Sequence, residues 1–219
     1  MGPTGAGKSY FINSVLNHPS MPVGSDLDSC TTELGFGCIE DIQNYPNLTN
    51  RRIVLIDTPG FDSPDLDDKE MLEKIITWLK QSQRKGAEIG GVIYLHDITK
   101  DRFSGTARQN LRLFQDMCRD DALKNVVLVT TKWSRKSKDS EKYQLQLEGK
   151  HWKTLIDKGA KVHRFDQGST SAWAAIDMII CAWDSKGAFQ TSSETKIKPP
   201  KILRNRLEGF FHSKRWWAF

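Results

Sequence analysis

The sequence predicts an α/β protein built on a doubly wound, mainly parallel sheet. A glycine-rich G-x-x-x-x-G-K-[ST] pattern at residues 2–9 leads into an apolar helical stretch. About 50 residues later, the apolar run 53–56 ends in Asp-Thr-Pro-Gly. Beyond it, short apolar runs of strand length alternate with amphipathic stretches of helix length. This alternation is typical of a parallel sheet covered by helices on both faces.

Residues 2–9, Gly-Pro-Thr-Gly-Ala-Gly-Lys-Ser, match the phosphate-binding loop pattern at every fixed position. Glycines allow the backbone conformations in which successive N–H groups turn toward a phosphate. Lys8 would place its ammonium on the terminal phosphates, and Ser9 would offer its hydroxyl to Mg²⁺. A helix predicted over residues 9–17 adds its N-terminal dipole to the same anion site. The candidate nucleotide-binding residues of this segment are Pro3, Thr4, Gly5, Ala6, Gly7, Lys8, Ser9 and Tyr10.

The second motif is the Asp-Thr-Pro-Gly sequence at residues 57–60. The run Ile53–Ile56 before it is continuous rather than alternating, which is typical of a strand buried on both faces. Asp57 at the end of this strand would hold the magnesium shell, and the Gly60 N–H would approach a γ-phosphate. Each motif alone could be an ordinary turn, but both together in this order predict a nucleotide-binding domain.

The motifs resemble those of the G-domain GTPases of the translation-factor-related class. Within that class, S-C-T at 29–31, D-T-P-G-F at 57–61, I-Y-L-H at 93–96 and A-L-K-N-V-V-L-V-T-T at 122–131 are similar to the fungal G-domain proteins. Those proteins are related to the avirulence-induced and immune-associated GTPases, to septins and to the chloroplast import receptors. The resemblance covers residues 1–183 and implies binding of GTP or GDP with Mg²⁺, and hydrolysis of GTP to GDP and phosphate.

The resemblance also implies a nucleotide-sensing threonine ahead of the strand expected over residues 34–42. Its hydroxyl would coordinate Mg²⁺ and its N–H would meet the γ-phosphate, so the loop would order only when that phosphate is present. Thr31 is the first candidate on the S-C-T pattern and Thr32 the second. A solvated Thr-Thr pair entering a strand is the alternative. The expected metal ligands are Ser9, Thr31 and Asp57.

The base-recognition motif departs from the family pattern. Where the G domains carry [NT]-K-x-D, this chain has Thr131, Lys132, Trp133 and Ser134. A carboxylate accepts two charge-assisted bonds from guanine, whereas a serine supplies at most one neutral contact. We expect Thr131, Lys132 and Trp133 to contact the nucleotide, with a weakened preference for guanine. A module without base selectivity or hydrolysis, and an ATPase or kinase-like enzyme, are the alternative functions.

Catalysis of phosphoryl transfer depends on positioning and charge stabilisation, for which Lys8, Thr31 and Gly60 are the candidates. In related enzymes a polar residue after D-T-x-G often orients the attacking water, but here that place holds Phe61. We therefore expect slow intrinsic turnover. The resemblance to septin-like and immune-associated GTPases implies that turnover is raised by a homodimer across the nucleotide face or by another partner. It also implies that the chain acts as a switch or scaffold.

Composition narrows the choice of cellular compartment and of binding partners. No apolar run of 18 residues and no secretory signal occur, and the four cysteines show neither metal nor disulfide spacing, which predicts a cytoplasmic protein. Residues 191–219 carry seven Lys/Arg against two Glu, so they account for all of the net charge of +5. The body is balanced, which argues against nucleic-acid binding.

We predict two regions: a G domain over 1–183, and a flexible linker with a basic-aromatic tail over 184–219. Residues 196–219 could contact an anionic membrane surface or a protein, or could be an unstructured end.

Only Met1 precedes the phosphate loop, although in this fold a buried strand leads into it. Either the chain begins late or another segment takes the central strand position, and we expect reduced stability. Further strands are expected over 91–96, 125–131 and 161–165, and helices over 67–85, 104–119, 136–158 and 171–183.

Overall fold

The computed structural model describes residues 1–23, 33–40, 42, 45, 48, 51–61, 67–100, 103–118, 120–135, 137–186 and 215–218. The strands are β1 (Gly35–Ile39), β2 (Arg51–Asp57), β3 (Glu88–Ile89), β4 (Val92–Asp97), β5 (Val126–Thr131), β6 (Lys161–Arg164) and β7 (Arg215–Ala218). The helices are α1 (Lys8–Leu16), α2 (Asp68–Arg84), α3 (Gly105–Met117), α4 (Ser140–Gln146), α5 (Lys153–Asp157) and α6 (Gly168–Lys186). A π-helical turn, Leu147–His151, joins α4 to α5.

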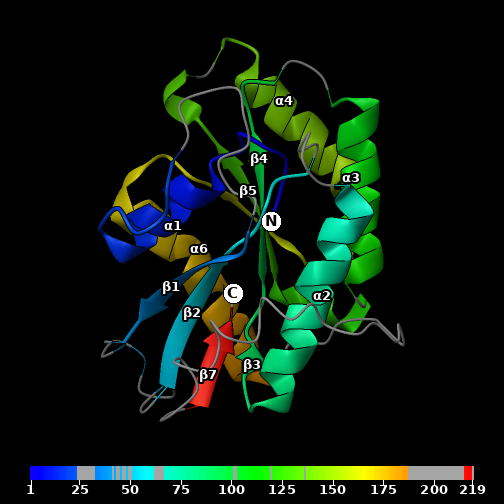
Figure 1. The fold of residues 1–219 in the computed structure, drawn as a ribbon. Helices are drawn as coiled ribbons and strands as arrows, with labels where there is room; N and C mark the ends of the chain where they lie inside the picture. The colour runs from blue at the N-terminus through cyan, green and yellow to red at the C-terminus, as the bar shows by residue number, and fades with distance from the viewer. Residues whose placement is uncertain are drawn as a thin grey trace.

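The strands form two sheet segments, in the order β1-β2-β7-β3 and β4-β5-β6 (Figure 1). β1 pairs antiparallel with β2, and all other pairs among the described strands are parallel. Every residue of strands β4 and β5 is buried. Strands covered on both faces require such continuous runs, so the doubly wound, mainly parallel α/β fold is confirmed.

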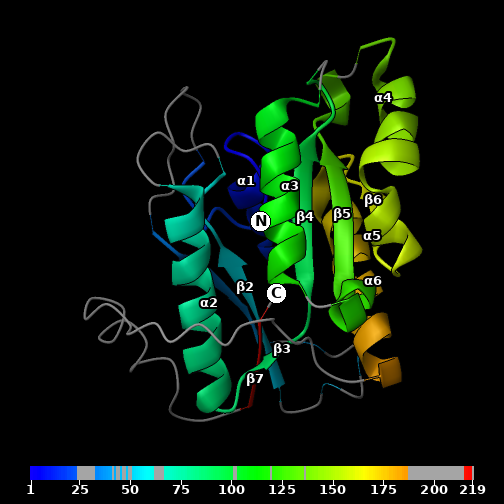
Figure 2. The same cartoon turned by 90° about the vertical axis from the view of Figure 1, so that its right-hand side faces the viewer.

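Helices cover the sheet on both faces and create two apolar cores (Figures 1 and 2). One core lies under α2, α3 and the α4–α5 region, and includes the fully buried Trp152 and Leu155. The other lies under α1 and α6. Helix α2 begins at its cap Asp67, whose carboxylate accepts hydrogen bonds from the N–H groups of Lys69 and Glu70.

The central strand position of the sheet is occupied from both ends. At one end, the Leu95 N–H donates to the Met1 carbonyl over 2.8 Å, so the residue entering the phosphate loop pairs with β4. At the other end lies β7, from the tail of the chain, between β2 and β3. β7 lies within the region that is predicted from the sequence to be a linker and tail, residues 184–219. Among the described helices, none combines the length and apolar character needed to span a bilayer.

Candidate nucleotide site

The phosphate loop is held by close backbone contacts with the segment that follows β2. The Phe61 N–H donates to the Gly2 carbonyl over 3.2 Å, and the Thr4 N–H donates to the Phe61 carbonyl over 2.8 Å. These bonds attach the loop to the segment that follows β2. A Cβ at Gly60 would stand 2.6 Å from the Thr4 backbone nitrogen, which only glycine avoids. The Asp-Thr-Pro-Gly turn therefore lies directly against the loop, as the predicted γ-phosphate contact of Gly60 requires.

The loop curls around the start of α1 through left-handed backbone conformations. Gly5 and Gly7 have φ angles of 75° and 88°, a region that favours glycine. The Lys8 ammonium lies over the loop and donates to the carbonyls of Gly2 and Pro3 at 3.1 and 3.0 Å. Burial lowers the pKa of Lys8 to about 8, against the opposing pull of the Asp57 charge. The result is a buried cation at the mouth of a backbone loop, which is the arrangement that binds polyphosphates.

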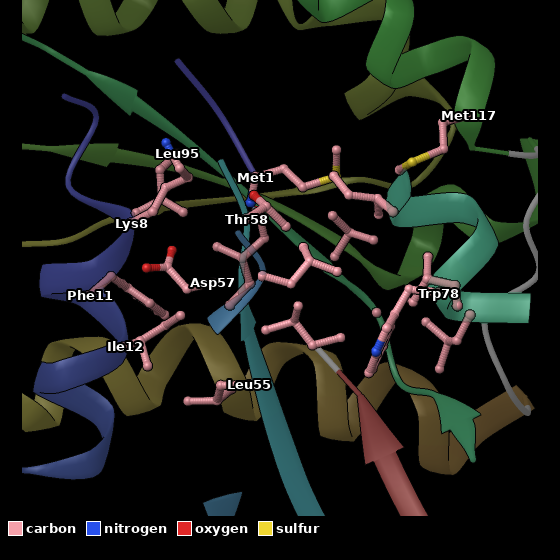
Figure 3. Close-up of a pocket in the computed structure, with 18 residues that line it drawn as sticks. Met1, Lys8, Phe11, Ile12, Leu55, Asp57, Thr58, Trp78, Leu95 and Met117 are labelled. Atoms are coloured by element: carbon pink, nitrogen blue, oxygen red, sulfur yellow. The ribbon is translucent and has the colours of Figure 1, made fainter. Parts of the chain in front are cut away.

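Two of the predicted metal ligands meet at the foot of the loop. The Ser9 hydroxyl on α1 donates a 2.6 Å hydrogen bond to the Asp57 carboxylate at the end of β2. Figure 3 shows the Asp57 carboxylate directed toward α1. One hydroxyl and one carboxylate oxygen side by side fit Mg²⁺, which binds few protein oxygens and completes its octahedron with water and phosphate. Among the described residues, no three His, Cys, Asp or Glu side chains form a group that could hold a metal ion.

The third predicted metal ligand, Thr31, and its alternative, Thr32, lie outside the described residues. The residue after the Asp-Thr-Pro-Gly turn, Phe61, is fully buried, and its ring packs 6.5 Å from that of Tyr94. Its side chain therefore belongs to the core and offers no group to a water molecule. The candidate catalytic set on the described residues reduces to Lys8 and Gly60.

At the base end of the site, Thr131 ties the strand to the phosphate loop, because its hydroxyl donates to the Ala6 carbonyl over 2.9 Å. Lys132 follows with a positive φ of 63° and forms an ion pair of 2.7 Å with Asp97 at the end of β4. Burial raises the pKa of the Asp97 carboxyl. Hydrogen bonds from Lys132 and Thr99 outweigh this effect and hold that pKa below its ordinary value. Asp97 thus fixes the lysine that is expected to pack on the base.

Trp133 and Ser134 have partners within the protein. The Trp133 indole is buried, donates to the Thr130 hydroxyl over 3.0 Å and lies under the Arg164 guanidinium, 4.2 Å from its ring centre. The Ser134 hydroxyl accepts a 2.8 Å hydrogen bond from the Gln167 amide. Gln167 has a φ of 82° in the loop between β6 and α6.

Two polar residues at this end were not predicted as site residues. Asp97 is the last residue of the buried strand β4, and the structure pairs it with Lys132. Its position could have marked it as a site residue, because the carboxyl ends of parallel strands meet at the edge of such sheets where ligands bind. Gln167 carried no signal in the sequence that marked it as a site residue. Tyr10, on the exposed side of α1, packs at 5.9 Å from the Phe165 ring and is 42% exposed.

Comparison with known proteins agrees with this geometry. Residues 1–132 match the family described as 50S ribosome-binding GTPase. The GTPase Era of Mycoplasma genitalium is 29% identical over 120 residues, which are 54% of this chain and 38% of that protein. The chain thus spans about two fifths of the length of this curated relative.

Solved structures of Toc33 from Arabidopsis thaliana share the fold. The complex with GDP and Mg²⁺ superposes with a TM-score of 0.66 at 15% identity, covering 88% of this chain and 86% of that one. The complex with Mg²⁺ and GMPPNP gives 0.65 at 15% identity, covering 87% and 85%. The sheet, the phosphate loop and the family match over 132 of 219 residues together show that the chain belongs to the 50S ribosome-binding GTPase family of G-domain proteins.

Proposed function

We propose that this chain binds GTP and GDP with Mg²⁺ and hydrolyses GTP slowly, acting as a switch or scaffold. The observation that carries the proposal is the Ser9–Asp57 hydrogen bond of 2.6 Å beneath a loop that holds the buried Lys8. It brings together two oxygens of the kind that bind Mg²⁺, next to the loop, and this supports the proposed metal and phosphate site. The complexes of Toc33 with GDP and Mg²⁺ and with GMPPNP support this assignment by analogy of fold.

In this mechanism the protein positions a polyphosphate and neutralises its charge. Mg²⁺, when bound through Ser9 and Asp57, would draw charge from the phosphate oxygens. Lys8 would donate to the terminal phosphates instead of the loop carbonyls, and the Gly60 N–H would face the γ-phosphate. Because the Phe61 ring is buried, no side chain at that place orients water, which supports a slow intrinsic rate.

The decisive experiment measures binding of GDP and GTP, with Mg²⁺, to the full chain and to Lys8→Ala. We expect Lys8→Ala to weaken binding about 10- to 100-fold, the range for a charged hydrogen bond of about 1.5–3 kcal/mol. Lys153→Ala is the matched control, since Lys153 is an exposed lysine whose ion pair is with Asp157 on α5. Equal affinities for wild type and Lys8→Ala would refute the assignment.

A second candidate is a nucleotide-binding module without base selectivity or hydrolysis. Two observations favour it: Ser134 stands where an aspartate is expected and is bound to Gln167, and Phe61 is a core residue. Competition of GTP and ATP for the site, together with phosphate release under single-turnover conditions, separates the candidates. Preference for GTP with turnover supports the GTPase. Equal binding without turnover supports the module, and preference for ATP indicates an ATPase or kinase-like enzyme.

We further propose that turnover is raised by a homodimer across the nucleotide face. The support comes from structural relatives, the chloroplast translocon components atToc33 and psToc159, for whose GTPase activity dimerization is important. A hydrolysis rate per chain that rises with protein concentration is the expected result, and a rate that is independent of concentration would refute it.

On the S-C-T and D-T-P-G-F motifs, we place the chain near the fungal, avirulence-induced and septin-like branch.

A further inference from the structure

Backbone strain is concentrated where β5 ends and where the loop between β6 and α6 passes. Among the described residues other than glycine, Asn17, Lys132 and Gln167 have positive φ angles. Asn17 ends α1 in the left-handed conformation that is common at helix ends. Lys132 and Gln167, with φ angles of 63° and 82°, end no helix. Such strain persists only where the surrounding structure holds it, and it is frequent at binding sites.

A hydrogen bond between two side chains holds the more strained of these residues. The Gln167 amide donates to the Ser134 hydroxyl over 2.8 Å, across 33 positions of the chain. Ser134 lies in the 3-10 turn Trp133–Arg135. The buried Trp133 fixes this turn, because its indole donates to the Thr130 hydroxyl over 3.0 Å. The bond therefore joins the turn after β5 to the loop before α6, and both of its side chains are exposed to a ligand.

The Ser134–Gln167 pair lies beside the phosphate loop. Just before the serine, the Thr131 hydroxyl donates to the Ala6 carbonyl over 2.9 Å. Just before the glutamine, the Phe165 ring packs 5.1 Å from the Phe11 ring of α1, and α1 lies alongside α6 (Figure 1). Ligands bind at the carboxyl ends of the strands in such sheets. A nucleotide whose phosphates occupy the loop would therefore bring its base to this pair.

The pair offers different hydrogen-bonding groups from a carboxylate, which only accepts. A glutamine amide has one accepting oxygen and one donating nitrogen, and a hydroxyl both donates and accepts. While the amide donates to the serine, its oxygen is an acceptor and the hydroxyl proton is a donor. If the amide turns over, the hydroxyl donates to it, the amide nitrogen becomes the donor and the hydroxyl oxygen becomes the acceptor. The pair can thus present a donor beside an acceptor in either order.

Purine bases carry the complementary groups at neighbouring positions. Adenine has an amino donor at position 6 and an accepting nitrogen at position 1. Guanine has an accepting oxygen at position 6 and a donating N–H at position 1. The donor and the acceptor thus exchange places between the two bases, as they do between the two orientations of the amide.

We propose that Gln167, together with Ser134, recognises the base, and that the site accepts adenine as well as guanine nucleotides because the Gln167 amide can turn over. This inference rests on the proposed function, since it requires that the phosphates bind at the loop. It names the substrate class as purine nucleotides, and it identifies Gln167 as the residue that determines specificity.

The first test compares the binding of GDP and ADP, each with Mg²⁺, to the full-length wild type and to Gln167→Gly. Glycine accepts a φ of 82° without strain, so this variant removes the side chain and preserves the loop. We expect the wild type to bind the two nucleotides within about tenfold of each other. In Gln167→Gly both affinities should fall together by about 3- to 10-fold, as for neutral hydrogen bonds.

The control is Gln109→Ala, which removes an exposed glutamine side chain from α3 and should bind both nucleotides like the wild type. Unchanged affinities in Gln167→Gly would overturn the proposal. A preference of the wild type for GDP over ADP greater than about 100-fold would overturn it as well, because such a preference corresponds to a site with fixed acceptors.

The second test is Gln167→Glu, which replaces one donor and one acceptor by two acceptors. The N–H at position 1 and the amino group at position 2 of guanine can donate to this carboxylate, whereas the nitrogen at position 1 of adenine is itself an acceptor. We expect the preference for GDP over ADP to rise about 10- to 100-fold. Gln109→Glu makes the same change of charge on α3 and should retain the ratio of the wild type. An unchanged ratio in Gln167→Glu would contradict the proposal.

Binding of inorganic pyrophosphate with Mg²⁺ to the wild type separates this inference from the proposed function, because pyrophosphate has no base. If pyrophosphate binds and the Gln167 variants bind both nucleotides like the wild type, this inference alone fails. If the wild type binds neither pyrophosphate nor nucleotide, the proposed function fails, and this inference fails with it.

Discussion

The Ser9 hydroxyl on α1 lies 2.6 Å from the Asp57 carboxylate at the end of β2, although the two residues are 48 positions apart in the chain. We predict that Asp57→Asn abolishes the benefit of Mg²⁺ for nucleotide binding, because an amide oxygen carries no charge for the cation. In the wild type, removal of Mg²⁺ with EDTA should weaken GDP binding, whereas the variant should bind equally weakly with and without the metal. Titration of both proteins with GDP, by calorimetry, measures this.

Asp157→Asn is the control for that prediction, since Asp157 lies on an exposed part of α5. It should retain the full response to Mg²⁺. A persistent response to Mg²⁺ in Asp57→Asn would show that another group holds the metal.

We predict that Gly60→Ala lowers both thermal stability and nucleotide affinity. The added Cβ would stand 2.3 Å from the Thr4 hydroxyl and 2.6 Å from its backbone nitrogen, so the loop and the turn after β2 must separate. Gly105→Ala on α3 is the matched control, because the added Cβ meets nothing within 4 Å. Alanine is also the better helix former, by up to about 1 kcal/mol. Differential scanning fluorimetry should show a lower melting temperature for the first variant only. A Gly60→Ala protein with unchanged melting and affinity would refute this account of the close approach.

We predict that Ser134→Asp raises the preference for GDP over ADP by about 10- to 100-fold. A carboxylate at this position can accept two bonds from guanine, and the penalty for the wrong base arises from polar edges that remain unpaired. The neighbouring Gln167 amide, which now donates to Ser134, could donate to the new carboxylate. Ser134→Asn is the uncharged control. Competition binding of the two nucleotides provides the ratio, and an unchanged ratio in Ser134→Asp would show that the base lies elsewhere.

We predict a loss of stability between pH 6.5 and pH 4 that depends on His96. Burial lowers the pKa of His96 from 6.5 to about 4, although the Asp97 charge opposes the shift. In this interval the unfolded chain binds a proton that the folded chain refuses, so the free energy of unfolding decreases as the pH falls. The shift corresponds to a loss on the order of 3 kcal/mol at the acid end.

The measurement is urea unfolding at several pH values for the wild type and for His96→Gln. The variant cannot bind the proton, so its free energy of unfolding should vary less over this range. His18→Gln is the control, because His18 is exposed and lies just after α1. Its free energy of unfolding should change with pH as in the wild type. Parallel pH profiles for wild type and His96→Gln would contradict the prediction.

Much of the site was predictable from the sequence because its chemistry is local. The spacing of Gly5, Gly7, Lys8 and Ser9 defines a phosphate loop before any fold is known. The continuous apolar run before Asp57 predicts a buried strand with a carboxylate at its end. Periodicity likewise predicts the covering helices, since burial on one helix face repeats every three to four residues. The roles expected for Thr31 and for Gly60 stay predictions.

Only the tertiary structure decided which distant residues meet. The Lys132–Asp97 ion pair and the Gln167–Ser134 hydrogen bond depend on the order of parallel strands, which brings β4, β5 and the loop after β6 to one edge. Nor could the sequence assign the tail segment Arg215–Ala218 to the centre of the sheet. Backbone hydrogen bonding is the same for every residue type, so a short strand carries little information about its partner until packing brings the two together.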